Sequence, residues 1–138
     1  MGRRAILYEG NAYALITMCQ LRKSCNLKSK IVITVNFGVV LVTAASEAEA
    51  ENLAKSLVEH KLAACVSLSP IRSIYTWQGE IQAESEWQLV IKTDLAKFEA
   101  LKTKVQELHS YEVPEIIAIP IIAGSDAYLN WLGQSLSL

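Results

Sequence analysis

The sequence predicts one mixed α/β (α+β) domain with elements in the order β-α-β-β-α-β, followed by a short third helix. Three observations predict it: a β-branched apolar run near residue 40, two segments with apolar residues at helical spacing, and two long strand-like segments around a Gln-Gly turn. The chain has 138 residues, of which 51% are hydrophobic, and this suits a single sizeable core. Its formal net charge of −1 favours neither nucleic acid nor an acidic membrane as a partner.

The N-terminal segment, residues 1–36, is expected to lie outside the domain that residues 37–138 form. It is either a loosely ordered extension or the product of a mis-assigned start codon. Its mildly apolar run over residues 5–19 is interrupted by Glu9 and Asn11, so it is a poor signal-peptide core and too short to span a membrane. The three cysteines are far apart and form no CxxC pair, which fits a reducing compartment and predicts a cytoplasmic protein.

The first strand and helix follow from residues 39–58. Residues 39–43 are a continuous apolar and β-branched run, typical of a central strand buried on both faces. Ser46 and Glu49 then form a capping box that begins a helix. Its apolar residues Ala50, Leu53, Ala54, Leu57 and Val58 recur at helical spacing and form one stripe.

Two long strands follow, over residues 63–77 and 80–93, joined by the turn Gln78-Gly79. The second strand alternates clearly. Its apolar face holds Ile81, Ala83, Trp87, Leu89 and Ile91, and its polar face holds Glu80, Gln82, Glu84, Glu86, Gln88 and Lys92. Carboxylates that alternate in this way usually do no more than solvate a strand.

The remaining elements complete the pattern. Asp94 is a good N-cap for a second helix that ends near His109, with a buried face of Leu95, Phe98, Leu101, Val105 and Leu108. Residues 115–123 predict an apolar fourth strand. A short helix after residues 124–126 is expected to be anchored by Tyr128, Leu129, Trp131 and Leu132.

This order predicts a ferredoxin-like sandwich with strands one and three in the centre. Pro70 and Pro120 fall in strands two and four, which agrees with edge positions because proline cannot donate to a ladder. Two long apolar edges promote aggregation unless they are covered. The sequence therefore predicts a closed homo-oligomer.

Pairing the hairpin about its turn places Cys65 opposite Lys92, on the face that also holds Ser67 and Glu86. A neighbouring ammonium would favour the thiolate, the form that binds metal or acts as a nucleophile. A one-residue bulge at Pro70 would instead turn Cys65 inward. The simpler interpretation is a small cysteine packed in a sheet.

His109 closes the second helix and begins the polar connection 109–115, where binding residues are more common than in a core. The sequence contains no HxxH, HExxH or Cys–His cluster, so no closed zinc site is encoded. No glycine-rich phosphate loop or GxSxG motif is present either.

Several motifs together resemble the CutA divalent-ion tolerance proteins. They are the segments 62–66 (LAACV), 73–79 (SIYTWQG), 91–93 (IKT), 109–116 (HSYEVPEI) and 128–132 (YLNWL). The resemblance implies a homotrimer whose long hairpins pack around a three-fold axis, with clefts between subunits. The implied cleft residues are Cys65, Trp77, Glu86, Lys92, Tyr111, Glu112 and Glu115. Two departures are Ser110, where the family usually has proline, and Val42, where some members have cysteine.

These features predict a trimeric protein that binds or responds to divalent metal and is not an enzyme. Cys65 and His109 are the expected metal ligands, for copper(II) or another divalent cation held weakly and not as an obligatory cofactor. One alternative is a regulatory module similar to the PII-like proteins, which bind a small ligand in clefts between subunits. Catalysis would need a nucleophile with a positioned base, for which only Cys65 and Lys92 come into question.

Overall fold

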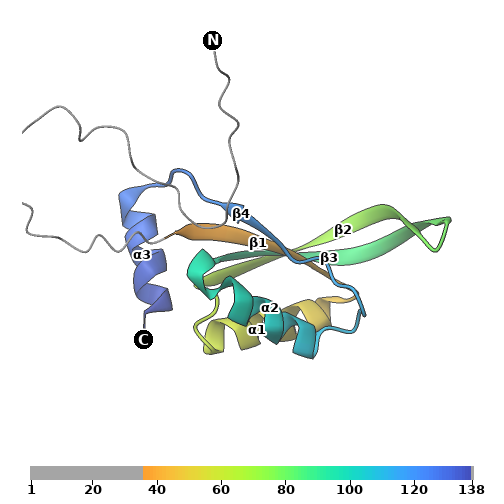
Figure 1. Ribbon diagram of the computed structural model, residues 1–138, viewed down its shortest axis with the longest axis horizontal. Helices are drawn as coiled ribbons and strands as arrows, with labels where there is room; N and C mark the ends of the chain where they lie inside the picture. Colours follow the sequence, from red (N-terminus) through yellow and green to blue (C-terminus); the bar gives the residue numbers. More distant parts are fainter. Residues whose placement is uncertain (1–35, 138) are drawn as a thin grey trace, which may run out of the picture. The chain divides into compact units, whose positions relative to one another are not determined.

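The computed structural model describes residues 36–137. Apart from Asn36, the extension predicted over residues 1–36 therefore lies outside the described residues. The described part contains a four-stranded antiparallel sheet of β1 (Phe37–Ala44), β2 (Cys65–Trp77), β3 (Glu80–Asp94) and β4 (Ile117–Pro120) (Figure 1). Their order, β2-β3-β1-β4, confirms the predicted ferredoxin-like arrangement with strands one and three in the centre.

The helices α1 (Glu47–Glu59) and α2 (Phe98–Leu108) cover one face of this sheet (Figure 1). Ser46 caps α1, since its Oγ accepts a hydrogen bond of 3.2 Å from the Glu49 amide. The Glu49 side chain reaches back to the amide of Ala45, one residue earlier than a capping box requires. Asp94 caps a short 3₁₀ helix, η1 (Leu95–Lys97), that precedes α2 and was not expected.

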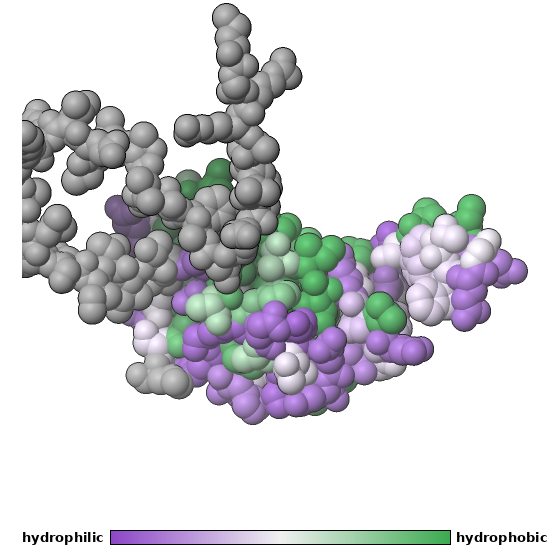
Figure 2. Space-filling view, in the orientation of Figure 1, coloured by the Kyte–Doolittle hydropathy of each residue, from purple (hydrophilic) through white to green (hydrophobic). Residues whose placement is uncertain are grey.

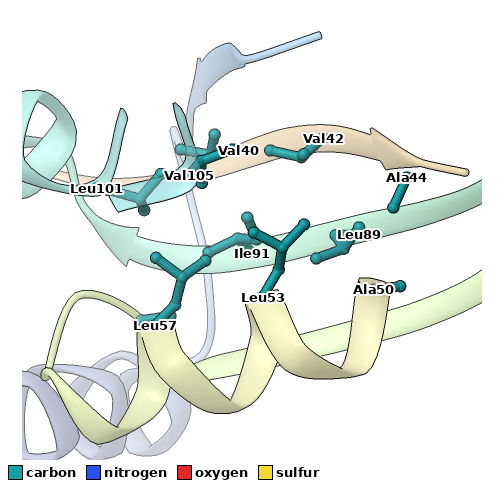
Figure 3. Close-up of a cluster of buried hydrophobic side chains, with 11 residues drawn as sticks. Val40, Val42, Ala44, Ala50, Leu53, Leu57, Leu89, Ile91, Leu101 and Val105 are labelled. Atoms are coloured by element: carbon teal, nitrogen blue, oxygen red, sulfur yellow. The ribbon is translucent and has the colours of Figure 1, made fainter. Parts of the chain in front are cut away.

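The core lies between the two helices and the sheet. Side chains from α1 and α2 meet those of β1 and β3 in one cluster (Figure 3). Its largest members are fully buried: Leu53, Leu57, Leu89, Ile91, Leu101, Val40, Val42 and Val105. Burying a side chain of this size contributes about 1.5–3 kcal/mol, so this cluster is the main source of stability of the helix-covered half.

The β2–β3 hairpin has the predicted register. Cys65 pairs with Lys92, and Trp77 pairs with Glu80 across the turn. Pro70 pairs with Trp87 without an extra residue, so the alternative bulge is wrong. Gln78 and Gly79 have φ values of 50° and 84°, which fits a type I′ hairpin turn.

Beyond Ala44, the last residue of β1, the hairpin continues without a third strand. Ala44 pairs with Trp87, and the two strands then project as an arm, residues 71–86, past the helix-covered part (Figure 1). A two-stranded ribbon is marginally stable in water by itself. Within the described residues the arm is therefore the least supported part of the sheet.

The C-terminal elements differ from the prediction. β4 is only four residues long, because it pairs just with the Gly38–Leu41 stretch of β1, and Ile122 beyond it is 96% exposed. In α3 (Asp126–Leu136) the inward positions are Leu132 and Leu136.

Two predicted anchors of α3 are on its outer side. Tyr128 and Trp131 are each 43% exposed, with ring centroids 5.3 Å apart, whereas Leu129 is half-buried. Leu108, the last residue of α2, was predicted to be buried but is 38% exposed. None of the described helices combines the length and apolarity that crossing a bilayer would require.

Candidate functional site

The candidate site is a pocket of about 710 Å³ at the base of the hairpin arm, which we call the arm-base pocket. Its strand residues lie on the face of the sheet turned away from α1 and α2, the open face. Side chains alternate along a strand, and directly paired residues point to the same side. This places Thr43, Ser73, Tyr75, Trp77 and Glu86 together on the open face.

The other wall of the pocket is the connection 110–115, which follows α2. His109 fixes the start of this connection. Its Nε2 donates to the carbonyl of Thr43 at 2.7 Å, and its Nδ1 accepts from the Tyr111 amide at 3.0 Å. Because a carbonyl can only accept, Nε2 carries the proton of the first bond, and Nδ1 also lies 3.6 Å from Glu49 Oε1. The side chain is fully buried, so a metal could reach it only by displacing one of these bonds.

Glu49 holds the same connection from α1. Its Oε1 accepts from the Ser110 amide at 2.7 Å, and its Oε2 accepts from the Ala45 amide. Burial acts to raise the pKa of Glu49, but the hydrogen bonds from Ser110 and Ala45 outweigh it, and the pKa falls below its usual value. A charged Glu49 therefore joins the start of α1 to the loop.

Tyr111 and Glu86 meet inside the pocket. The tyrosine hydroxyl donates to Glu86 Oε1 at 3.0 Å, and only 5% of Glu86 is exposed. The sequence pattern predicted a solvated carboxylate here, which is wrong because the loop covers this part of the open face. Burial, with the hydrogen bond and negative charge of Glu86, raises the pKa of Tyr111 to about 12.

The end of the connection is fixed to the centre of the sheet. Gln88 donates through Nε2 to Glu115 Oε2 at 3.3 Å and to the Val42 carbonyl at 3.4 Å. Glu112, between the two fixed points, is exposed and also lines the pocket. The pocket thus combines three carboxylates with the aromatic side chains Tyr75, Trp77 and Tyr111.

Five of the seven predicted cleft residues line the arm-base pocket: Trp77, Glu86, Tyr111, Glu112 and Glu115. Cys65 and Lys92 do not. Lys92 is six residues from Glu86 along β3, roughly 20 Å at the usual rise of a strand. Its Nζ donates to Ser67 Oγ, which leaves Cys65 as a free, half-buried thiol.

Some lining residues were not predicted: Thr43, Ser73, Tyr75, Ser110, Val113 and Pro114. The alternation of β2 contained the signal for two of them. Ser73 and Tyr75 share their strand face with Trp77, as the confirmed register shows. No sequence pattern indicates that Thr43 lines the pocket, and only the position of the loop 110–115 shows it.

Within one chain, Cys65 and His109 are too far apart to share a metal. Cys65 pairs with Lys92, which pairs with Val39, whereas His109 binds the carbonyl of Thr43. Val39 and Thr43 are roughly 13 Å apart along β1. Among residues 36–137 no three His, Cys, Asp or Glu side chains are grouped so that they could hold a metal ion. A site that uses both residues would need two subunits.

Comparisons with known proteins agree with this architecture. The family model described as CutA1 divalent ion tolerance protein matches residues 38–135. The divalent-cation tolerance protein CutA of Thermus thermophilus is 49% identical over 98 residues, which cover 70% of this chain and 95% of that protein. The chloroplastic protein CutA of Arabidopsis thaliana is 48% identical over 98 residues, 70% of this chain and 54% of that protein.

A solved structure gives the same result in three dimensions. The periplasmic divalent cation tolerance protein CutA from Archaeoglobus fulgidus superposes with a TM-score of 0.72 at 40% sequence identity, over 73% of this chain and 99% of that one.

Proposed function

The chain belongs to the CutA1 divalent ion tolerance protein family, and from that premise we propose that it acts as a homotrimer that binds divalent cations weakly, copper(II) among them. The binding serves tolerance of, or response to, the metal and involves no catalysis. The observation that carries the assembly is the hairpin arm, which continues without a third strand.

Exposed apolar side chains support the assembly. On the arm, Ile74 is 72% exposed and Ile81 79% exposed. On the opposite edge of the sheet, Ile117 and Ile119 of β4 are about half exposed. Green patches over the tip and over the middle of the molecule show such apolar surface in Figure 2. Apolar edges of this kind promote pairing with another chain, and a closed ring of subunits would cover them.

The support for cation binding is the chemistry of the donors. The arm-base pocket offers carboxylates from Glu86, Glu112 and Glu115, and Cys65 offers a thiol elsewhere on the open face. Copper(II) and similar ions accept nitrogen, oxygen and sulfur donors. Affinity should be low, because each chain supplies few ligands to any one point, and neighbouring subunits would complete the set.

Sedimentation velocity tests the assembly. The wild-type chain should sediment as a trimer, and Ile81→Lys should shift it toward monomer by placing charge in the interface. Val58→Lys, on the outer part of α1, is the control and should leave the trimer intact. A wild-type chain that sediments only as monomer contradicts the assembly.

Isothermal titration with copper(II) tests the metal part. Wild type should release heat with weak affinity, and Cys65→Ala should reduce the affinity. His109→Gln keeps a side-chain donor toward the Thr43 carbonyl but removes the imidazole. A lower copper(II) affinity in this variant would show that the imidazole binds the metal. Absence of heat above the buffer for wild type contradicts metal binding.

The size of the arm-base pocket favours a second candidate function, a regulatory module that binds a small ligand between subunits. A volume of about 710 Å³ is typical of small-molecule sites and far exceeds the space a metal ion needs. Binding of a small molecule that survives both Cys65→Ala and His109→Gln would favour this function over the metal.

We also propose a cytoplasmic location, which the scattered cysteines support. The relatives include one chloroplastic and one periplasmic protein. Fractionation of the source cells with an antibody against the chain tests the location, and recovery in any other fraction contradicts it.

A further inference from the structure

The side chains around the arm-base pocket have only one sign of charge. Glu86, Glu112 and Glu115 contribute three carboxylates, and no lysine, arginine or histidine is among the described residues that line the pocket. Such a lining attracts cations and repels anions. The sign of the ligand charge therefore follows from the residues alone.

Glu86 has an oxygen available for a ligand. Oε1 accepts from Tyr111, whereas Oε2 has no hydrogen-bond partner among residues 36–137. No fully buried side-chain oxygen in that part of the chain is left without a partner. Oε2 of the 95%-buried Glu86 therefore keeps access to solvent, and the pocket that Glu86 lines supplies this access.

The rest of the wall is aromatic or apolar. Tyr75 and Trp77 come from β2, and Tyr111, Val113 and Pro114 come from the loop. In the single chain Tyr75 is 40% exposed, so its ring is accessible there, and the ring of Tyr111 lies next to Glu86. Aromatic faces attract ammonium groups, most strongly where water is excluded. Three or four donors converging on one point, as a metal ion requires, are not found among the described residues.

We propose that the arm-base pocket binds an organic ammonium ion with an apolar or aromatic body. The ammonium group binds Glu86 Oε2, with the exposed Glu112 as a second carboxylate. The apolar body lies against Tyr75 and against the ring of Tyr111, whose hydroxyl donates to Glu86. This inference rests on the second proposed function, ligand binding in the cleft, and gives that ligand a chemical class.

Three probes with nearly the same body and different charge test it: phenethylammonium, 2-phenylethanol and phenylacetate, titrated into the full-length chain at neutral pH. Phenethylammonium should bind at least about tenfold more tightly than the neutral alcohol, a difference in keeping with one buried charge contact and one cation–π contact. Phenylacetate should not bind. Equal affinity for all three, or no binding of the ammonium compound, overturns the proposal.

Variants locate the charge. Glu86→Gln keeps the shape and should lower the affinity for phenethylammonium about tenfold, with little effect on the alcohol. The matched control is Glu84→Gln, an exposed carboxylate two residues away on the same face of β3, which should change the affinity less than twofold. An equal loss in both variants overturns the proposal. If Glu86→Gln does not fold, Glu112→Gln at an exposed position makes the same test, with a smaller expected loss of about threefold.

Failure of this inference is distinguishable from failure of the proposed function. A chain that binds the neutral alcohol or phenylacetate at least as tightly as phenethylammonium keeps ligand binding in the cleft and loses only the ligand class. A chain that is monomeric loses the assembly, whatever the probes do.

Discussion

The hydroxyl of Tyr111 donates a hydrogen bond of 3.0 Å to Glu86, joining the loop after α2 to the base of the hairpin arm. Because the acceptor is a carboxylate that is 95% buried, the bond is stronger than a neutral one at the surface. The same contact closes one side of the arm-base pocket. Stability and ligand binding therefore depend on the same pair of residues.

Tyr111→Phe should lower the free energy of unfolding by about 1–2 kcal/mol, since Glu86 loses a partner where water reaches it poorly. Urea denaturation at a fixed protein concentration measures this, because the stability of an oligomer depends on concentration. Tyr128→Phe is the control. That ring is exposed on α3, and its variant should be within about 0.5 kcal/mol of wild type. Equal losses in the two variants would contradict a specific role for the Tyr111 hydroxyl.

High pH should destabilise the fold through the same tyrosine. Its folded-state pKa of about 12 lies above its usual value of 10, so the folded state holds the proton more tightly than the unfolded chain does. The resulting stabilisation is fully present below pH 10 and is lost as pH rises toward 12. Denaturation midpoints measured between pH 9 and 12 should fall less steeply in Tyr111→Phe than in wild type. Parallel curves would show that this proton is not linked to folding.

Glu49 gives the opposite dependence at low pH. Its folded-state pKa is lowered, so its contribution is present above the usual value of 4.5 and is lost as pH falls through the folded value. Glu49→Gln should be less stable at pH 7 by about 1–3 kcal/mol, with a shallower loss of stability in acid.

The control for Glu49 is Glu51→Gln on the same helix, where the carboxylate forms an exposed pair with Lys55. Such pairs contribute less than about 1 kcal/mol. Acid denaturation curves of Glu51→Gln should follow wild type. A Glu49→Gln curve that also follows wild type would show that the contact with the Ser110 amide does not stabilise the loop.

Leu53→Ala tests the core. Leu53 is fully buried between α1 and the sheet, so the variant should lose about 2–5 kcal/mol through lost burial and a residual cavity. Val58→Ala, on the same helix but 40% exposed, should lose less than about 1 kcal/mol. Thermal denaturation followed by circular dichroism compares the two. Similar midpoints would mean that α1 does not pack as described.

Much of the fold was predictable because local rules agreed with one another. The turn Gln78-Gly79 between two long strands predicted the register without a bulge, and Cys65 does pair with Lys92. Ser46 and Asp94 marked helix starts through capping chemistry. What failed depended on long-range packing: α3 turns Trp131 outward, and β4 is limited by the short part of β1 that it can pair with.

The site was less predictable than the fold for the same reason. Glu86 looks like any alternating surface carboxylate until the loop covers it, and no local pattern shows where a loop will lie. Trp77, Tyr111 and Glu115 were found because they belong to recognisable motifs. Cys65 shares the open face with Glu86 but is well separated from it along the strands. Assigning two residues to the same face of a sheet does not show how far apart they lie.

The arm has one further consequence. Because side chains alternate every two residues along both of its strands, adding or removing a residue pair in each strand near the turn would change its reach and leave the base of the sheet unaltered. The length of the arm and the architecture of the helix-covered body are therefore set by separate residues, and redesign can change one without changing the other.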